Sequence, residues 1–356
     1  MHYKTTESLL AFIKKSPTAF QATAEMEKKF AENGYQLLSE QEYWKLQPGG
    51  KYIVTRNHSA LIAFSIPKKE CRKFHIIASH SDSPAFKIKE NPEMRVENAY
   101  TKLNVEGYGG MLMAPWFDRP LSVAGRVVVR RDGSLKEELV NIDRDLVMIP
   151  SLAIHMNREA NKGVSYNPQK DLLPLLGCGD SKPEFLKIVA EEIKVKEEDI
   201  LAHDLFLYNR MEGTIWGADR EFVSAPRLDD LQCAFASMEG MLAGKHEESI
   251  AVHCVLDNEE VGSGTKQGAA STFLKDTLLR INMGLGRTYE EYLMTLENGS
   301  STPLKHITSD YHYHTVAADS KETLDFIQDT LKEKGFLAEL RDFEPVEFPQ
   351  NGQDAL

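Results

Sequence analysis

The sequence predicts an α/β protein in which a helix-flanked sheet is interrupted by a β-rich insert. Strand-type and helix-type patterns alternate near both ends of the chain, which is typical of an α/β sheet domain. From about residue 91 to residue 222, short apolar runs alternate with Gly and Pro, and only one helical pattern is found. We therefore expect residues 1–90 and 222–356 to form one α/β domain and residues 91–221 to form the insert.

The N-terminal part contains two helix patterns followed by strand patterns. Leu9, Phe12 and Ile13 recur at helical spacing, and Ser16-Pro17 ends this pattern. Asn33-Gly34 is a pair of residue types that closes a helix. The following runs are rich in β-branched and aromatic residues. The expected elements are helices Thr5–Lys15 and Ala19–Glu32, a hairpin of Tyr52–Thr55 with Ala60–Ile66, and a buried strand Phe74–Ala78.

The insert and the C-terminal part continue this series. Asp132-Gly133 indicates a hairpin turn, and Gly107-Tyr108-Gly109-Gly110 is interpreted as another turn of the insert. His253 and Cys254 stand inside an apolar run and are expected in the core. The expected elements are strands Gly125–Arg130, Leu205–Asn209 and Ser249–Leu256, and helices Glu184–Ile193, Leu231–Leu242, Ser271–Ile281 and Lys321–Lys334.

Composition limits the classes of function. The 356 residues are 42% hydrophobic, enough to fill a sizeable core, and carry a net charge of -12. This charge argues against nucleic acid and anionic membrane as partners. The absence of an apolar span and of a signal-peptide pattern predicts a cytoplasmic protein. Its four cysteines form no CxxC pair, and we expect buried thiols at Cys71, Cys178, Cys233 and Cys254.

The first motif with chemical content is His80-Ser81-Asp82-Ser83-Pro84, directly after a predicted strand. Sheets of this class bind ligands at the carboxyl ends of their strands. Asp82 can reach the imidazole nitrogen of His80 that faces away from a metal. The alternative is an ordinary loop histidine with a capping aspartate.

The second motif is Pro226-Arg227-Leu228-Asp229-Asp230-Leu231, a turn leading into a helix. Either carboxylate could cap that helix by accepting from free backbone N–H groups. As the functional alternative, one of them would bridge two divalent cations.

The third motif, Asp257-Asn258-Glu259-Glu260-Val261-Gly262-Ser263, follows the predicted strand Ser249–Leu256. Acidic pairs are common on solvated helices, but crowded carboxylates beside a buried strand need a compensating cation. One glutamate would then bind a metal and its neighbour would act as general base. Together the three motifs supply the His and carboxylate ligands of open zinc sites, which cobalt or manganese would also suit.

These three motifs, with the segments Trp116–Ser122 and Ile149–Arg158, resemble the aspartyl aminopeptidases of the M18 family over roughly Met1 to Gly299. The resemblance implies a zinc-exopeptidase-like sheet flanked by helices, with a β-rich inserted domain, and two zinc ions. It implies that His80 binds one zinc, Asp229 bridges both and Glu260 binds the other. Glu259 would be the general base, and Asp82 would orient His80.

The resemblance also implies what the protein acts on and how it assembles. It implies a metalloaminopeptidase that hydrolyses N-terminal residues, preferably Asp or Glu, from peptides. Residues 91–221 would drive assembly into a homo-oligomer, in the family a tetrahedral particle of twelve subunits. His155 would help bind substrate in the active site of a neighbouring subunit.

After Gly299 the sequence departs from the family. A Ser-Ala-Asp-x-x-His-Ala pattern and a Met-His-Ser pattern, each with a metal ligand, are not present, so each zinc is expected to lose one ligand. His306, Asp310, His312 or His314 would replace them, or would belong to an ordinary polar segment. The alternative function is a catalytically impaired or truncated M18-like subunit with an assembly role. A metal-dependent amidohydrolase acting on small amides is a third hypothesis.

Overall fold

The computed structural model describes residues 3–178, 184–292, 306–308 and 314–316, in two separate units. One unit comprises Thr6–Gly299, and the other comprises Met1–Thr5 with Ser300–Leu356. In the second unit, β14 (His306–Thr308) pairs antiparallel with β15 (His314–Val316). The predicted helix Lys321–Lys334, Asp310 and His312 lie outside the described residues.

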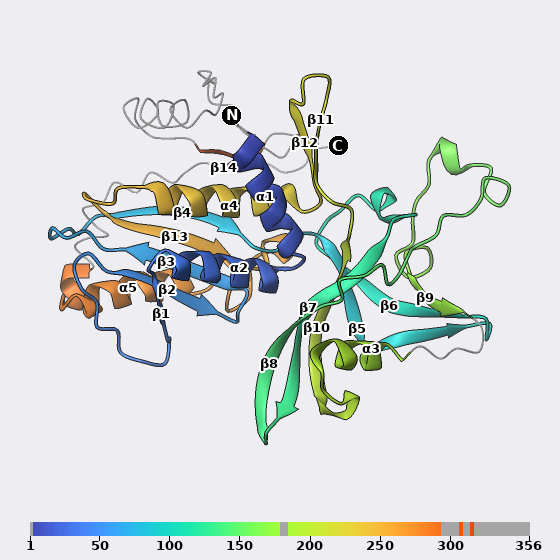
Figure 1. The fold of residues 1–356 in the computed structure, drawn as a ribbon, viewed down its shortest axis with the longest axis horizontal. Helices are drawn as coiled ribbons and strands as arrows, with labels where there is room; N and C mark the ends of the chain where they lie inside the picture. Colours follow the sequence, from blue (N-terminus) through green and yellow to red (C-terminus); the bar gives the residue numbers. More distant parts are fainter. Residues whose placement is uncertain (1–2, 179–183, 293–305, 309–313, 317–356) are drawn as a thin grey trace, which may run out of the picture. The chain divides into compact units, whose positions relative to one another are not determined.

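A five-stranded mixed sheet has the order β1-β2-β3-β13-β4 (Figure 1). β2 and β3 form the predicted hairpin, closed by Asn57 and His58 with positive φ. β13, far along the sequence, lies antiparallel to β3 and parallel to β4. The strands are β1 (Gln36–Leu38), β2 (Lys51–Arg56), β3 (Ala60–Ser65), β4 (Phe74–His80) and β13 (Ile250–Leu256).

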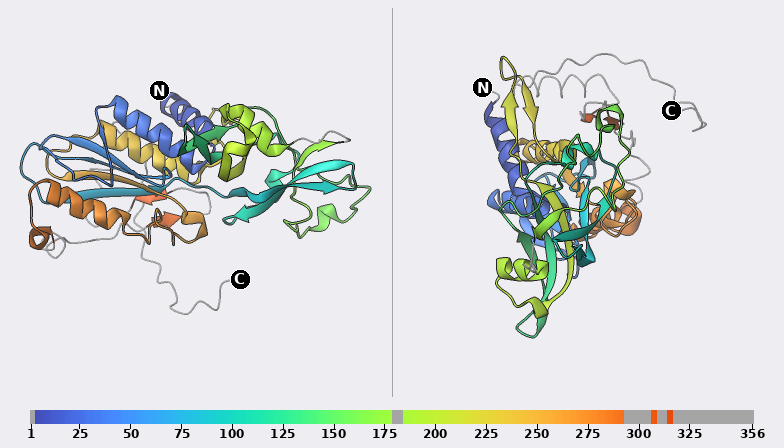
Figure 2. Two further views of the ribbon diagram at one scale, coloured as in Figure 1. Left: turned by 90° about the horizontal axis from the view of Figure 1, so that it is seen from below. Right: turned by 90° about the vertical axis from the view of Figure 1, so that its right-hand side faces the viewer.

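Helices cover both faces of this sheet, because successive side chains of its buried strands point to opposite faces. Ile53, Leu61 and Val255 belong to one apolar cluster with the helices α1, α2 and α4. Ile62 and Cys254 belong to the cluster on the opposite face with α5 (Figure 2). The helices are α1 (Tyr3–Lys15), α2 (Ala19–Glu32), α4 (Leu228–Ala243) and α5 (Phe273–Gly284).

A second, six-stranded sheet has the order β8-β7-β10-β5-β6-β9, with all neighbours antiparallel. Valines of β7 and leucines of β10 form its apolar core, against which Phe185 and Val189 of α3 (Phe185–Ile193) pack. The strands are β5 (Ala85–Val96), β6 (Tyr100–Tyr108), β7 (Leu121–Arg131), β8 (Ser134–Asn141), β9 (Leu175–Cys178) and β10 (Ile200–Asn209); a separate hairpin joins β11 (Thr214–Trp216) to β12 (Phe222–Ser224).

The predicted fold class is confirmed, and most predicted elements are present. Corrections concern their ends: β4 runs on to His80, α4 begins at Leu228, and β6 extends through Tyr108, so the turn predicted from Gly107 starts two residues later, at Gly109. The expected boundaries near residues 90 and 221 stay a prediction. Short 3-10 helices are η1 (Ala114–Trp116), η2 (Ala160–Lys162), η3 (Glu197–Asp199) and η4 (Glu259–Val261).

The prediction of four buried thiols is wrong for three of them. Cys254 is buried, whereas Cys178 is exposed and Cys71 and Cys233 are half-buried. Cys178 ends the edge strand β9, and Cys71 lies in the loop before β4, where fewer atoms can cover a side chain.

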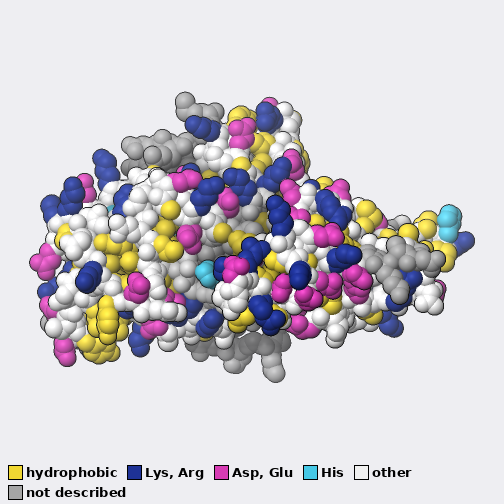
Figure 3. Space-filling view, turned by 60° about the horizontal axis from the view of Figure 1, so that its bottom comes forward, with side chains coloured by type: hydrophobic (Ala, Val, Ile, Leu, Met, Phe, Trp, Pro, Cys, Tyr) yellow, Lys and Arg dark blue, Asp and Glu magenta, His cyan; other side chains and the backbone are white. Residues whose placement is uncertain are grey.

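Acidic and basic side chains are interspersed over the molecular face drawn in Figure 3, and hydrophobic side chains reach the surface between them. In the described part of the chain, no helix combines the length and the apolar character that a bilayer crossing requires.

Candidate functional site

The ends of β4 and β13 bring the first and third motifs together. The parallel register pairs Leu256 with His80, and the backbone N–H of Ser81 donates to the carbonyl of Leu256 over 2.8 Å. Because parallel neighbours end at the same edge, the residues after each strand must meet there. His80 is therefore placed beside the η4 turn that carries Glu259 and Glu260.

Asp82 is a buried acceptor at this edge, with only 4% of its surface exposed. Its Oδ1 accepts from the backbone N–H of Glu259 at 3.1 Å and lies 3.3 Å from Nδ1 of His80. Its Oδ2 accepts from the backbone N–H of Glu260 at 3.2 Å and from the hydroxyl of Tyr108 at 2.7 Å. These hydrogen bonds lower the pKa of Asp82 against the opposing effect of burial.

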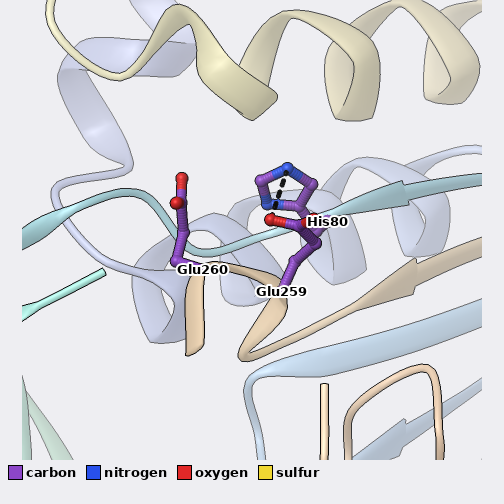
Figure 4. Close-up of side chains that lie close together, drawn as sticks. All are labelled: His80, Glu259 and Glu260. Carbon is purple, nitrogen blue, oxygen red and sulfur yellow. Dashed lines mark ion pairs between the residues drawn. The ribbon is translucent and has the colours of Figure 1, made fainter. Parts of the chain in front are cut away.

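The other imidazole nitrogen of His80 faces a group of carboxylates. Nε2 lies 3.5 Å from Oδ1 of Asp229, 3.7 Å from Oδ2 of Asp230 and 3.9 Å from Oε2 of Glu259. Figure 4 shows Glu259 directed at this imidazole, with Glu260 on the same turn. Two sets of potential ligand atoms, each within 4.8 Å of one another, comprise His80, Glu259 and Glu260, and His80, Asp229 and Asp230.

The second motif reaches this group through an irregular start of α4. Arg227 has a left-handed φ of 58°, and its half-buried guanidinium donates to the carbonyls of Ile13 and Ser16. Asp229 departs from helical geometry, and the peptide bond that follows it is cis. Asp230 is buried and accepts from the backbone N–H of His80 at 3.0 Å. The N-cap residue of α4 is Arg227, which makes no side-chain capping hydrogen bond, and both aspartates stand in the first turn of the helix.

The electrostatics of the cluster show crowded negative charge. Burial, together with Asp82, Asp229 and Glu259, raises the pKa of Glu260 to about 7 against the attraction of His80. Burial alone would lower the pKa of His80, but hydrogen bonds to Asp229 and Asp82 outweigh it and raise this pKa to about 11. The site thus combines one imidazole with several carboxylates, which together stabilise positive charge. This set of donor atoms fits zinc, and it also suits cobalt or manganese.

Tyr108, Gly109 and Asn258 also belong to this site, and the sequence did not reveal their roles. Tyr108 ends a strand of the six-stranded sheet, yet its hydroxyl contacts Asp82 and accepts from Nδ2 of Asn258 at 2.8 Å. The only available signal was a glycine pair directly after a strand. A cavity of about 450 Å³ adjoins these residues and is lined by Asp82, Tyr108 and Asn258 among others.

The remaining candidate residues within the described ranges are His155, His306 and His314. His155 is exposed in a turn between β8 and β9, and neither set of potential ligands in the described residues includes it. His306 and His314 lie on the paired strands β14 and β15 of the other unit.

Comparisons with known proteins identify the family of this chain. A family model described as Aminopeptidase I zinc metalloprotease (M18) matches residues 12–312. A probable M18 family aminopeptidase 2 from Clostridium acetobutylicum is 45% identical over 300 residues, covering 82% of this chain and 69% of the relative. A chain in the cryo-EM structure of the Ape4 and Nbr1 complex matches with a TM-score of 0.76 and 34% identity. A chain of the S. cerevisiae mApe1 dodecamer matches with a TM-score of 0.68 and 27% identity.

The structural matches extend over most of this chain. They cover 81% of it for the Ape4 chain and 78% for the mApe1 chain. This chain spans only part of each matched chain, 61% of the Ape4 chain and 66% of the mApe1 chain. With the family model matching most of the sequence, the chain belongs to the M18 family of aminopeptidase I zinc metalloproteases.

Proposed function

We propose that this protein is a metalloaminopeptidase that hydrolyses N-terminal residues from peptides. The observation that carries the proposal is the convergence of one imidazole and several carboxylates at the ends of β4 and β13. In this proposal His80, Asp229 and Glu260 are metal ligands, with Asp229 as the bridging one. Family membership supports zinc as the metal.

Each side chain has a task that follows from its surroundings. The backbone carbonyl of Asp82, 3.2 Å from Nδ1 of His80, and its carboxylate Oδ1, 3.3 Å away, both face Nδ1–H, which leaves Nε2 as the ligand atom toward Asp229. Glu259 is more than half exposed, so its carboxylate can take a proton from an attacking water and return it to the leaving amine. When bound, the zinc ions would acidify that water and polarise the scissile carbonyl.

Substrate preference is a separate part of the proposal. The resemblance to aspartyl aminopeptidases supports N-terminal Asp or Glu, which requires a cation in the substrate pocket. The adjoining cavity is lined by two such cations, Lys87 and Arg126. Each forms an ion pair with Asp204. Rates of release of Asp, Glu and Leu from unblocked dipeptides would separate an acidic preference from an apolar one.

We also propose a homo-oligomer in which residues 91–221 make the contacts and His155 reaches a neighbouring active site. The mApe1 relative is described as a dodecamer. His155 stands in an exposed segment with the apolar side chains of Leu152, Ile154 and Met156. The alternative is a subunit that keeps this assembly role without catalysis.

The test replaces Glu259 with Gln, which removes the base and preserves its shape. We expect Glu259→Gln to lower kcat about 10²–10⁴-fold, while zinc content measured by mass spectrometry stays at the wild-type value. Glu247→Gln, at an exposed position after α4, is the matched control.

Three other outcomes are informative. Undiminished turnover by Glu259→Gln would remove this residue from the mechanism. Wild-type protein with little zinc and no turnover would favour the assembly role. Turnover of acetylated amino acids, but not of peptides with a free amine, would favour the amidohydrolase hypothesis.

A further inference from the structure

We propose that Tyr108 and Gly109, at the end of β6 in the six-stranded sheet, are positioning residues for the metal site. The inference rests on the proposed function and extends it to a second part of the chain. Tyr108 acts through Asp82, and Gly109 acts through Glu260. Neither residue touches the proposed reacting groups itself.

The hydroxyl of Tyr108 is held in one orientation. It donates to Oδ2 of Asp82 at 2.7 Å and accepts from Nδ2 of Asn258 at 2.8 Å. Oδ1 of Asn258 in turn accepts from Oγ1 of Thr265 at 2.7 Å and from Nε2 of Gln267 at 2.8 Å. The ring of Tyr108 packs edge-on against Phe206, with centroids 5.4 Å apart. This network fixes the phenol from both ends.

The contact with Asp82 matters because each oxygen of that carboxylate has a defined partner set. Oδ2 receives the Tyr108 hydroxyl and the backbone N–H of Glu260. Oδ1 receives the backbone N–H of Glu259 and faces Nδ1 of His80. Without the phenol hydroxyl, Oδ2 loses its shortest hydrogen bond, and the carboxylate can rotate away from the imidazole. Groups that orient a metal-ligating histidine commonly change metal affinity 10–100-fold when removed.

Gly109 acts by its lack of a side chain. A Cβ at this position would lie 2.9 Å from Cβ of Glu260 and 3.3 Å from its Oε2. Contacts of 2.9 Å between carbon atoms are repulsive, so any side chain at Gly109 would displace Glu260. Gly109 also has a φ of +74°, which favours glycine by itself.

Gly133 separates these two effects. It has the same φ of +74°, but a Cβ there would meet nothing within 4 Å. Gly133→Ala therefore reports the backbone cost alone, and Gly109→Ala reports that cost plus the displacement of Glu260. Tyr100→Phe, at a half-exposed tyrosine on the same strand β6, is the matched control for Tyr108→Phe.

The experiment measures zinc affinity of the full chain by competition with a chromogenic chelator, together with the melting temperature of the metal-free protein. We expect Tyr108→Phe and Gly109→Ala to weaken zinc binding about 10–100-fold relative to their controls. Their metal-free melting temperatures should fall modestly below those of Tyr100→Phe and Gly133→Ala, because Tyr108→Phe removes a partner of Asp82 and Asn258 and Gly109→Ala crowds Glu260. With peptide substrate and saturating zinc, kcat should fall while KM changes little.

One result would overturn the inference. Zinc affinities equal to those of the controls, with lowered melting temperatures, would assign Tyr108 and Gly109 a structural role only. If Gly109→Ala does not fold, Tyr108→Phe decides alone, because it removes a single oxygen. Failure of the proposed function is distinguishable, since wild-type protein would then bind no zinc before any substitution is made.

Discussion

His253 is an imidazole in the interior of the five-stranded sheet. It is fully buried on β13, with Nε2 2.8 Å from Oγ of Ser237 in α4 and its ring against Phe30 of α2. Burial lowers the pKa of His253 to about 4, so the ring is neutral near pH 7. The sequence-based prediction that His253 and Cys254 are core residues is confirmed.

The low pKa of His253 predicts that the free energy of unfolding decreases in acid. An unfolded histidine has a pKa of about 6.5, so as pH falls from 6.5 toward 4 the unfolded state takes up a proton that the folded state does not. The contribution of neutral His253 to stability is complete above pH 6.5 and is lost as pH falls to 4, an effect of up to about 3 kcal/mol. Urea unfolding of metal-free protein at pH 7.5 and pH 5 should show that His253→Gln loses less stability than the wild type. His75→Gln, at an exposed position on β4, should behave like the wild type. An equal loss in all three proteins would contradict the prediction.

At the scale of elements, the pairing of β4 with β13 builds the site. His80 and Leu256 are register partners although 176 residues separate them, and the acidic turn follows directly. The sequence predicted both strands and the motifs after them. The motifs and the family resemblance predicted that His80 and this turn share one site, but the pairing of His80 with Leu256 could not be predicted, because register is set by side-chain packing between distant segments.

A buried glutamine on α2 joins the five-stranded sheet region to the insert. Nε2 of Gln21 donates to the carbonyls of Gly125 at 2.9 Å and Val140 at 2.8 Å, on β7 and β8. Gln21→Met would keep the length of the side chain and leave two buried carbonyls without these donors. We expect the free energy of unfolding to fall by about 1–3 kcal/mol, measured by urea denaturation. Lys28→Met, at an exposed position of the same helix, should change it far less, and equal effects of the two would contradict the role of Gln21.

At the scale of the whole molecule, the proposed assembly makes a measurable prediction. We expect light scattering to give a mass several times the 40.2 kDa of one chain. Replacing the exposed Leu152 and Met156 together by Asp should lower this mass, because charge would enter an apolar contact. Leu37→Asp, at an exposed leucine of β1 outside residues 91–221, is the control. A monomeric wild-type protein would contradict the proposed assembly.

The sequence by itself determined the elements and the chemistry that each motif can perform. Periodicity predicted the helices and strands, because burial of one face repeats at fixed intervals along an element. Residue types predicted an imidazole and carboxylates as ligands, since these groups carry the same donor atoms in any fold. The resemblance to a family added an assignment of roles to His80, Asp229, Glu259 and Glu260.

Only the tertiary structure decided how the residues of distant segments contact one another at the site and which further residues join them. It placed Asp230 at the backbone N–H of His80 and put both aspartates near the imidazole Nε2, at 3.5 Å for Asp229 and 3.7 Å for Asp230. It also brought Tyr108 and Gly109 from the six-stranded sheet to Asp82 and Glu260. These contacts depend on strand register and on the packing of two sheets. Local sequence does not encode them, because each contact joins two segments that lie far apart in the sequence.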